Sequence, residues 1–501
     1  MQHWILATAL LLAMGSANAQ PKNEPAEKEK TWSVVPGTES VTKQSITVNG
    51  SKLNYTVQCG YMHLRNDTGK VIAKMFYTYY LKDGETPDKR PITFCFNGGP
   101  GSSSVWLHMG GIAPRRVLLD DEGKATTPPY KIVDNEYGWL DKTDLVFLDP
   151  ISTGYSRPAP GEKAGQFHGY VEDISSVGAF VQTFLNKKQR WASAKYLAGE
   201  SYGTTRAAGL SKYLQDRYRI YINGVILISA VLNFGSNDYY VGHDLPRVLY
   251  IPTFTAAAWY HKKLSPALQA DLQKTLRESE AFAMGEYATA LLKGGWLSQA
   301  EKEKVAEKMA YFTGLSKEYC LQSNLRVTED RFYKQLRRTD GLTIGRLDGR
   351  FVGRDLEDAG ESVSFDPSFA NIDGPFTATM NDYFQRELKF TTEEDYNIFG
   401  NVRPWNYNNV QNQFLNVAES LRDAMAKNPS LKVYLGGGFY DFATPYFTAQ
   451  YDLEHMQLRP EQRSRVRTHW YESGHMYYIH KPSLVQFKKD MDAFFDWNPG
   501  Q

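Results

Sequence analysis

The chain has few cysteines, no excess of charge of either sign, and only one long hydrophobic run. Its three cysteines, Cys59, Cys95 and Cys320, are too few for a fold built on disulfides. Lys and Arg number 57 and Asp and Glu 56, which leaves a net charge of +1, whereas a nucleic-acid-binding protein would carry a basic excess. Cys and His are nowhere spaced as in a metal site. We therefore expect a globular protein held together by its hydrophobic core, with no metal and no nucleic-acid partner.

The one long hydrophobic run lies at the start of the chain. It extends from Trp4 to Met14, and these about 11 residues are too few for a helix that spans a bilayer, which needs about 20. The small residues of Ala17-Asn18-Ala19 suit a signal-peptidase site. We predict a cleaved signal peptide at 1–19 and a flexible polar leader at 20–39, so that the mature protein is secreted or periplasmic and has no membrane span. A buried N-terminal helix is the alternative, and the polar leader argues against it.

The rest of the chain alternates between short hydrophobic runs and helical patterns. Nearly continuous hydrophobic runs are typical of the buried strands of an α/β sheet; they occur at Ile92–Phe96, Leu145–Leu148, Tyr196–Ala198, Val225–Ile228 and Val433–Leu435. Helical periodicity follows at Val171–Asn186 and Thr205–Tyr218. The alternation predicts a layered α/β fold.

A middle segment interrupts this alternation. Residues 234–405 carry helical patterns and polar loops but no further strand–helix pairs. We therefore predict a core made of residues 40–233 and 406–501, with 234–405 inserted as a mainly helical cap. A bare sheet needs far fewer residues between its strands, and ligands bind at the carboxyl ends of strands in such sheets. We expect the cap to cover that edge.

The strongest chemical signal is Gly199-Glu200-Ser201-Tyr202-Gly203. It directly follows a predicted strand and precedes a helical pattern, as a nucleophile elbow must. A glycine-bounded turn without chemistry is the alternative. A serine nucleophile needs a base and an orienting acid, which follow it along the chain in the order acid, then histidine. Asp441 and His475 come after predicted strands in that order, which favours the catalytic interpretation.

A glycine-rich loop follows the strand at Ile92–Phe96. Its sequence is Asn97-Gly98-Gly99-Pro100-Gly101-Ser102-Ser103-Ser104. Glycines allow backbone amides to approach a ligand closely, so the loop could supply an oxyanion hole. An ordinary glycine-rich turn is the alternative, and a phosphate loop is excluded because no Gly-Lys-Ser/Thr follows.

Together these segments resemble the serine carboxypeptidase family. The matching motifs run in the family's order; they are NGGPGSSS at 97–104, LDPISTGYS at 148–156, GESYG at 199–203, Asp441–Pro445, and GHMYYIHKP at 474–482. The resemblance implies an α/β-hydrolase core with a helical insertion over the active site. It also implies release of C-terminal amino acids from peptide substrates, without metal or organic cofactor.

The resemblance assigns roles to individual residues. It makes Ser201, Asp441 and His475 the catalytic triad. It makes the backbone amides of Gly99 and Tyr202 the oxyanion hole. The substrate's terminal carboxylate would be bound by Asn97, Gly98 and Glu200, and Met476 would line the pocket for the leaving residue.

The sequence departs from the family at two positions. Ser102 stands where the family usually has cysteine. Gly111 stands where the family has a second carboxylate-binding glutamate. The nearby His108, Arg115 and Arg116 are candidates to compensate, although an ordinary surface or loop residue is the favoured interpretation of each.

The sequence therefore predicts a serine peptidase with carboxypeptidase-like specificity that acts through an acyl-enzyme. An esterase or acyltransferase with the same triad is the first alternative. A non-catalytic binding protein on a hydrolase fold is the second. The oligomeric state and the pairing of Cys59 with Cys95 stay open at this point.

Overall fold

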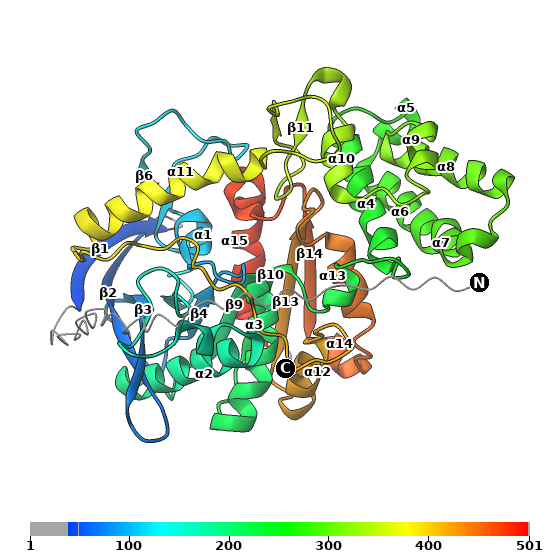
Figure 1. Ribbon diagram of the computed structural model, residues 1–501. Coiled ribbons are helices and arrows are strands. Elements are labelled where there is room, and N and C mark those ends of the chain that lie inside the picture. Colours follow the sequence, from blue (N-terminus) through cyan, green and yellow to red (C-terminus); the bar gives the residue numbers. More distant parts are fainter. Residues whose placement is uncertain (1–38, 49, 499–501) are drawn as a thin grey trace, which may run out of the picture.

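A computed structural model describes residues 39–48 and 50–498 of the chain. Its centre is one mixed sheet with helices on both faces (Figure 1). The strand order is β1-β2-β3-β7-β4-β9-β10-β13-β14, with β8 paired to β3. Neighbours from β7 to β14 are parallel, whereas β1, β2, β3 and β7 pair antiparallel.

The strands of this sheet are β1 (Ser40–Val48), β2 (Ser51–Arg65), β3 (Val71–Lys82), β4 (Ile92–Phe96), β7 (Asp144–Leu148), β8 (Arg157–Pro158), β9 (Lys195–Ser201), β10 (Gly224–Ala230), β13 (Lys432–Gly438) and β14 (Val466–Tyr471). Two small hairpins pair β5 (Arg115–Val117) with β6 (Ile132–Asp134), and β11 (Thr343–Ile344) with β12 (Val352–Gly353). The helices are α1 (Val105–Leu107), α2 (Tyr170–Lys187), α3 (Tyr202–Tyr213), α4 (Leu245–Tyr260), α5 (Pro266–Gln269), α6 (Leu272–Phe282), α7 (Ala288–Lys293), α8 (Gln299–Thr313), α9 (Lys317–Gln322), α10 (Glu329–Gln335), α11 (Pro367–Asp382), α12 (Ala418–Lys427), α13 (Tyr446–Glu454), α14 (Pro460–Arg463) and α15 (Lys481–Asp496).

The predicted α/β class and the predicted central strands are confirmed. Every residue of β4, β7, β10 and β13 is buried, because helices cover both faces of a parallel sheet. On one face Phe94 and Phe96 of β4 pack in a core with α2, α3 and α12. On the other face Cys95 belongs to a core with α15 and α11. Alternate residues of one strand thus face two different cores.

One expected helix begins later than the sequence pattern indicates. Helical periodicity favours a helix over Val410–Lys427, but α12 begins only at Ala418. The preceding residues form turns and a bridge between Asn416 and Asn233. Asn412 has a φ of 57°, a conformation that asparagine tolerates better than most residues. The asparagine-rich stretch therefore favours turns over helix.

The segment between β10 and α12 packs in two separate parts (Figure 1). Helices α4 to α10 gather at one end of the molecule around their own core, which includes Phe254, Phe332 and Phe442. Helix α11 instead runs across the other half of the sheet, where Ile372 and Phe376 join the core beneath β4. The residues that connect these two parts come close to the carboxyl ends of the strands.

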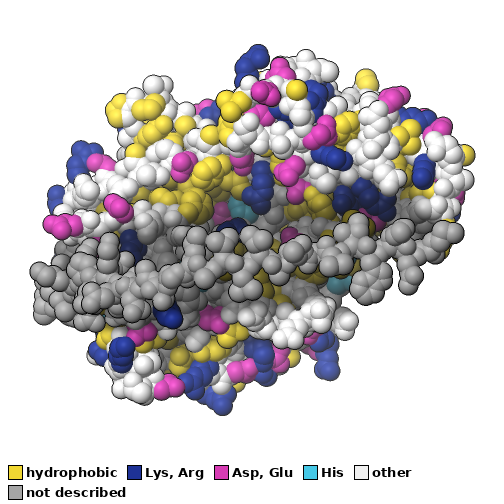
Figure 2. All heavy atoms as spheres, viewed as in Figure 1, with side chains coloured by type: hydrophobic (Ala, Val, Ile, Leu, Met, Phe, Trp, Pro, Cys, Tyr) yellow, Lys and Arg dark blue, Asp and Glu magenta, His cyan; other side chains and the backbone are white. Residues whose placement is uncertain are grey.

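The three cysteines are buried and free, so Cys59 and Cys95 form no disulfide. No helix in the described ranges is both long and apolar enough to cross a membrane. The predicted signal peptide, and the leader apart from Glu39, lie outside the described residues. Figure 2 shows acidic and basic side chains interspersed over the visible face.

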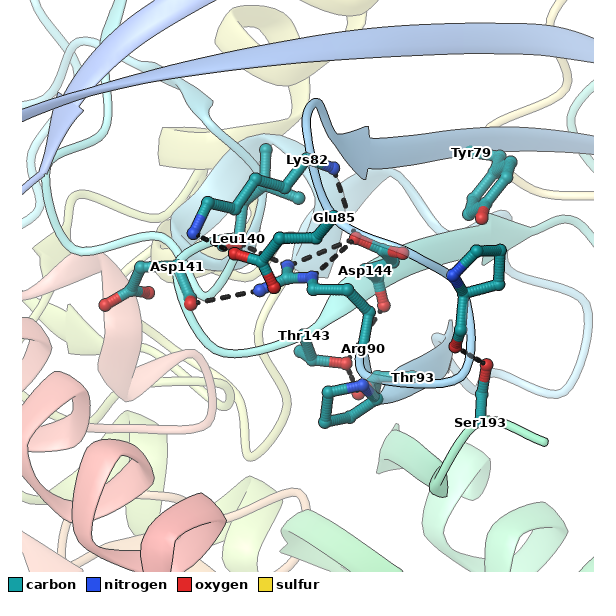
Figure 3. A network of polar contacts seen from close by, with 12 residues as sticks. Tyr79, Lys82, Glu85, Arg90, Thr93, Leu140, Asp141, Thr143, Asp144 and Ser193 are labelled. Atoms are coloured by element: carbon teal, nitrogen blue, oxygen red, sulfur yellow. Dashed lines mark hydrogen bonds and ion pairs between the residues drawn. The ribbon is translucent and has the colours of Figure 1, made fainter.

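A buried charge cluster joins the amino-terminal ends of the central strands. Asp144 of β7 is 2% exposed. Its Oδ1 accepts hydrogen bonds from Arg90 Nε (3.2 Å) and Nη2 (3.1 Å), and its Oδ2 accepts one from Arg190 Nη1 (2.6 Å). Figure 3 shows Arg90 reaching Asp144 beneath the turn that follows β3. One carboxylate thus balances two buried guanidinium groups.

We expect Asp144→Ala to lower the free energy of unfolding by about 3–5 kcal/mol, because both guanidinium groups stay buried without their partner. Chemical denaturation followed by intrinsic fluorescence measures the loss. The matched control is Asp496→Ala, which breaks the ion pair between Asp496 and Lys142. The side chain of Asp496 is 66% exposed, so we expect the free energy of unfolding to change by less than about 1 kcal/mol. Equal effects of the two substitutions would contradict the prediction.

Candidate active site

Ser201 lies on the sharp turn between β9 and α3. Its backbone has φ 58° and ψ −130°, a strained conformation for a residue with a side chain. The turn leaves no room beside it, since a Cβ on Gly199 would lie 2.1 Å from the carbonyl oxygen of Gly203. Ser201 lines a cavity of about 350 Å³ at the carboxyl ends of the strands. This is the elbow geometry that the sequence predicts.

Asp441 and His475 meet at the same edge of the sheet. Asp441 follows β13 and His475 follows β14, and parallel neighbours end at one edge. The Nδ1 of His475 lies 2.7 Å from Oδ2 of Asp441. Asp441 is fully buried, and its Oδ1 accepts hydrogen bonds from the amides of Ala443 (2.8 Å) and Thr444 (3.0 Å). The carboxylate is thereby held in one orientation toward the imidazole.

The imidazole of His475 is buried beside two carboxyl groups. Burial alone lowers the pKa of His475, but the contact with Asp441, and more weakly Glu200, outweighs it and raises the pKa above its ordinary value. Ser201 and His475 line the same cavity. In the described part of the chain Ser201 Oγ makes no hydrogen bond, to His475 included. Such bonds are often long before substrate binds.

The glycine-rich loop passes directly against the elbow. A Cβ on Gly98 would lie 2.4 Å from the backbone nitrogen of Tyr202. The amide of Tyr202 opens α3 and has no partner within that helix, and the amide of Gly99 makes no backbone hydrogen bond in the described residues. Both amides belong to residues beside Ser201 or on the cavity wall. The arrangement is suited to stabilise an oxyanion.

A buried carboxylate and a buried guanidinium hold this loop in place. Asp149, from the LDPISTGYS motif, accepts hydrogen bonds at 2.8 Å from both the amide and the hydroxyl of Ser104. On the other side Arg206 of α3 donates to the carbonyl oxygen of Asn97 (2.6 Å) and to Asp173 (2.7 Å). Arg206 and Asp173 are almost completely buried. The loop is therefore tied to both the sheet and the helix that carries the elbow.

Glu200 is a buried carboxyl group beside the serine. Asn97 Nδ2 donates to its Oε2 at 2.5 Å, and its Oε1 lies 3.9 Å from His475 Nε2. Burial raises the pKa of Glu200 to about 7, although His475, Tyr478 and Asn97 lower it. Near neutral pH this group is therefore available both as a hydrogen-bond donor and as an anion.

Tyr478 fills the space beside Gly111. A Cβ on Gly111 would lie 3.0 Å from Cβ of Tyr478, and one on Gly110 would lie 2.3 Å from its ring. The hydroxyl of Tyr478 donates to Oε2 of Glu200 at 2.6 Å. Burial raises the pKa of Tyr478 well above its ordinary value, so the phenol stays a donor. A tyrosine from the end of the chain thus contacts Glu200, while position 111 carries no side chain.

The three residues considered as compensation for Gly111 do not line this cavity. His108 is buried against Tyr80, whose hydroxyl lies 2.6 Å from its Nε2. Arg115 forms ion pairs with Asp134 and Glu387. Arg116 lines a different, small surface pocket.

Part of the cavity wall comes from the segment between β10 and α12. The segment contributes the hydrophobic residues Leu347, Phe369, Ile372 and Phe399, while Trp106 of α1 and Met476, next to His475, complete the hydrophobic lining. Arg346 and Asp366 add charge to the same wall, and Ser102 Oγ accepts a hydrogen bond from Trp106 Nε1 at 2.9 Å. Sequence reasoning missed Arg346 and the role of Tyr478, although Tyr478 lies inside a motif that it used. No pattern in the sequence marks Arg346.

No cluster of three metal-binding side chains occurs within residues 39–48 and 50–498.

Comparison with known proteins identifies the family. The family model of serine carboxypeptidases matches residues 48–482. The chain belongs to the serine carboxypeptidase family. The central sheet, its covering helices and the strand–serine–helix turn confirm the α/β-hydrolase fold expected for a member.

Individual relatives of this serine carboxypeptidase family member are distant. Serine carboxypeptidase-like 40 of Arabidopsis thaliana is 26% identical over 198 residues, which cover 37% of this chain and 36% of that protein. Carboxypeptidase Y of Saccharomyces cerevisiae is 24% identical over 198 residues (37% and 34%). Serine-type carboxypeptidase F of Aspergillus niger is 30% identical over 142 residues (27% and 23%). The chain thus aligns with about a third or less of the length of these relatives.

A solved acetylester hydrolase from Corynebacterium glutamicum is similar at a TM-score of 0.37 and 14% identity, over 89% of this chain and 97% of that chain. The fold assignment rests on the sheet order and not on this overlap.

We expect Gly98→Ala to slow the reaction of Ser201 with a fluorophosphonate about 10²–10³-fold. The added methyl group would collide with backbone atoms of Tyr202 and Gly203, which cannot move aside, so the two amides would lose their alignment. The control is Gly285→Ala, where nothing lies within 4 Å of the new Cβ. A folded Gly98→Ala protein that is labelled at the wild-type rate would refute the prediction.

Proposed function

We propose that this protein is a serine carboxypeptidase that releases C-terminal residues from peptides through an acyl-enzyme. Ser201 attacks the scissile carbonyl, His475 transfers the proton to the leaving amine, and Asp441 holds the imidazole in the required tautomer. The observation that carries the proposal is the contact of His475 with Asp441 at 2.7 Å in the cavity that Ser201 also lines. The family assignment supports the same chemistry.

In this proposal the amides of Gly99 and Tyr202 stabilise the tetrahedral oxyanion. Asn97, Gly98 and Glu200 bind the substrate's terminal carboxylate. A protonated Glu200 can donate a hydrogen bond to that carboxylate, whereas an ionised one would repel it. Tyr478 and Asn97 orient Glu200 through their hydrogen bonds to Oε2. Met476 lines the pocket for the residue that leaves.

We further propose that residues 1–19 are a signal peptide cleaved near Ala19, and that the mature protein is secreted or periplasmic. N-terminal sequencing of the protein recovered from the host's medium or periplasm tests this. A mature protein that begins at Met1 would refute it.

We expect Ser201→Ala to lower peptide turnover by about 10⁴–10⁶-fold without unfolding the protein, because the substitution removes the attacking hydroxyl. Asp441→Asn should be similarly severe, because the amide stabilises the wrong tautomer of His475. Turnover of blocked peptides is measured with free and with amidated C-termini. Equal cleavage of peptides with free and with amidated C-termini would refute carboxypeptidase activity and would favour an esterase or an endopeptidase. More than a tenth of wild-type turnover in Ser201→Ala would remove Ser201 from its role.

We expect kcat/KM for free-acid peptides to fall as the pH rises through about 7, where Glu200 loses its proton. An ester substrate without a free carboxylate should not show this fall, and Glu200→Gln should abolish it, because an amide donates at every pH. Tyr478→Phe removes a donor that stabilises the ionised form and therefore raises the pKa of Glu200. The pH at which kcat/KM falls should then rise by about one unit. If kcat/KM of Tyr478→Phe falls at the same pH as in the wild type, the assignment of this fall to Glu200 is contradicted.

A further inference from the structure

Arg346 lies on a loop that is bonded to both loops of the triad. Residues 345–351, here called the triad-contacting loop, connect β11 to β12. The carbonyl oxygen of Leu347 accepts a hydrogen bond from the amide of His475 (2.7 Å), and that of Arg346 accepts one from the amide of Phe442 (3.1 Å). Asp348 Oδ2 accepts a hydrogen bond from the amide of Gly474 at 3.0 Å. The backbone of Arg346 is therefore fixed beside the reacting groups.

The guanidinium of Arg346 has no partner in the described part of the chain. No hydrogen bond or ion pair of its side chain occurs there, although the residue lines the same cavity as Ser201, Glu200 and His475. Arg350, four positions further along the same loop, contrasts with it. Its Nη2 lies 2.7 Å from Oδ2 of Asp348, and the pair is buried.

The acidic groups nearest to Arg346 are bound to other donors. Asp366 accepts hydrogen bonds from the backbone amide of Arg346 (3.0 Å) and from the amide (2.9 Å) and hydroxyl (2.5 Å) of Ser368, so it caps α11. Asp441 is held by His475, Ala443 and Thr444. The cavity thus holds a permanent cation with open hydrogen-bonding positions.

We infer that Arg346 binds a carboxylate group of the peptide substrate in this cavity, which rests on the peptidase function proposed above. A guanidinium matches a carboxylate through two parallel hydrogen bonds, and a carboxylate is the anionic group that an unmodified peptide carries. Two sources share this chemistry. One is the side chain of an acidic residue next to the scissile bond, and the other is the terminal carboxylate itself.

The test compares wild type with Arg346→Gln on pairs of N-acylated dipeptides. One pair has Glu or Gln as the released residue, a second pair has Glu or Gln before it, and each is made as free acid and as amide. If Arg346 binds an acidic side chain, KM should rise about 10- to 100-fold for one Glu peptide, while its Gln match changes less than twofold. If it binds the terminal carboxylate, KM should rise for every free acid and for no amide.

Two further variants separate binding from a structural effect. Arg346→Lys should fall between wild type and Arg346→Gln, because lysine keeps the charge but loses the two-pronged geometry. Arg386→Gln is the matched control, since Arg386 is 76% exposed and pairs with Asp382, and it should leave all kinetic constants unchanged. Unchanged KM values in Arg346→Gln overturn the inference. So do equal losses on acidic, neutral and amidated peptides.

A second readout is independent of peptide cleavage. N-acyl-glutamate and N-acyl-glutamine are tested for protection of Ser201 against a fluorophosphonate. If the wild type cleaves no peptide, the proposed function fails. Carboxylate binding by Arg346 in this cavity is still supported if the glutamate compound protects at least tenfold better in wild type than in Arg346→Gln, and it is refuted if protection is the same in both.

Discussion

The close passage of the glycine-rich loop against the serine turn is the constraint on which the site depends. No side-chain atom fits between Gly98 and the backbone nitrogen of Tyr202, since a Cβ there would lie 2.4 Å from it. This contact brings the amides of Gly99 and Tyr202 to one side of Ser201. Because one amide follows the end of β4 and the other begins α3, their positions follow from the packing of β4, β9 and α3.

Buried charged side chains hold the glycine-rich loop against the serine turn. Arg206 bonds both to Asp173 and to the carbonyl oxygen of Asn97, and a buried guanidinium is tolerated only where it is paired in this way. Asn97 in turn directs its side-chain amide to Glu200. The same low-dielectric surroundings that make these hydrogen bonds strong also raise the pKa of Glu200. The protonation of one carboxyl group is therefore tied to the packing of α2 against α3.

The segment between β10 and α12 contributes more than a cover. Its two parts pack on opposite halves of the sheet, and the triad-contacting loop between them bonds to the residues around Asp441 and His475. The phenylalanines of α11 and the following loop, Phe369 and Phe399, line the same cavity as Ser201 and His475. A displacement of α4–α10 or of α11 would therefore change the positions of the His475 imidazole and of Arg346.

The amino-acid sequence by itself determined the α/β class, the central strands and the order of Ser201, Asp441 and His475. Short buried strands appear in the sequence as continuous hydrophobic runs, and a tight strand–helix turn requires glycines. The local sequence pattern is therefore enough to predict these features. The sequence failed over residues 410–417, where asparagines favour turns, although spacing suggested helix.

Only the tertiary structure decided which side chains surround Ser201, Asp441 and His475. The sequence has a glycine at position 111 where the family has a glutamate. In the fold Tyr478, more than 300 residues later, packs against Gly110 and Gly111 and places its hydroxyl on Glu200. Arg115 is drawn into ion pairs elsewhere, whereas Arg346 is brought to the cavity with no partner. Contacts between residues far apart in sequence depend on how whole elements pack, and no local pattern records them.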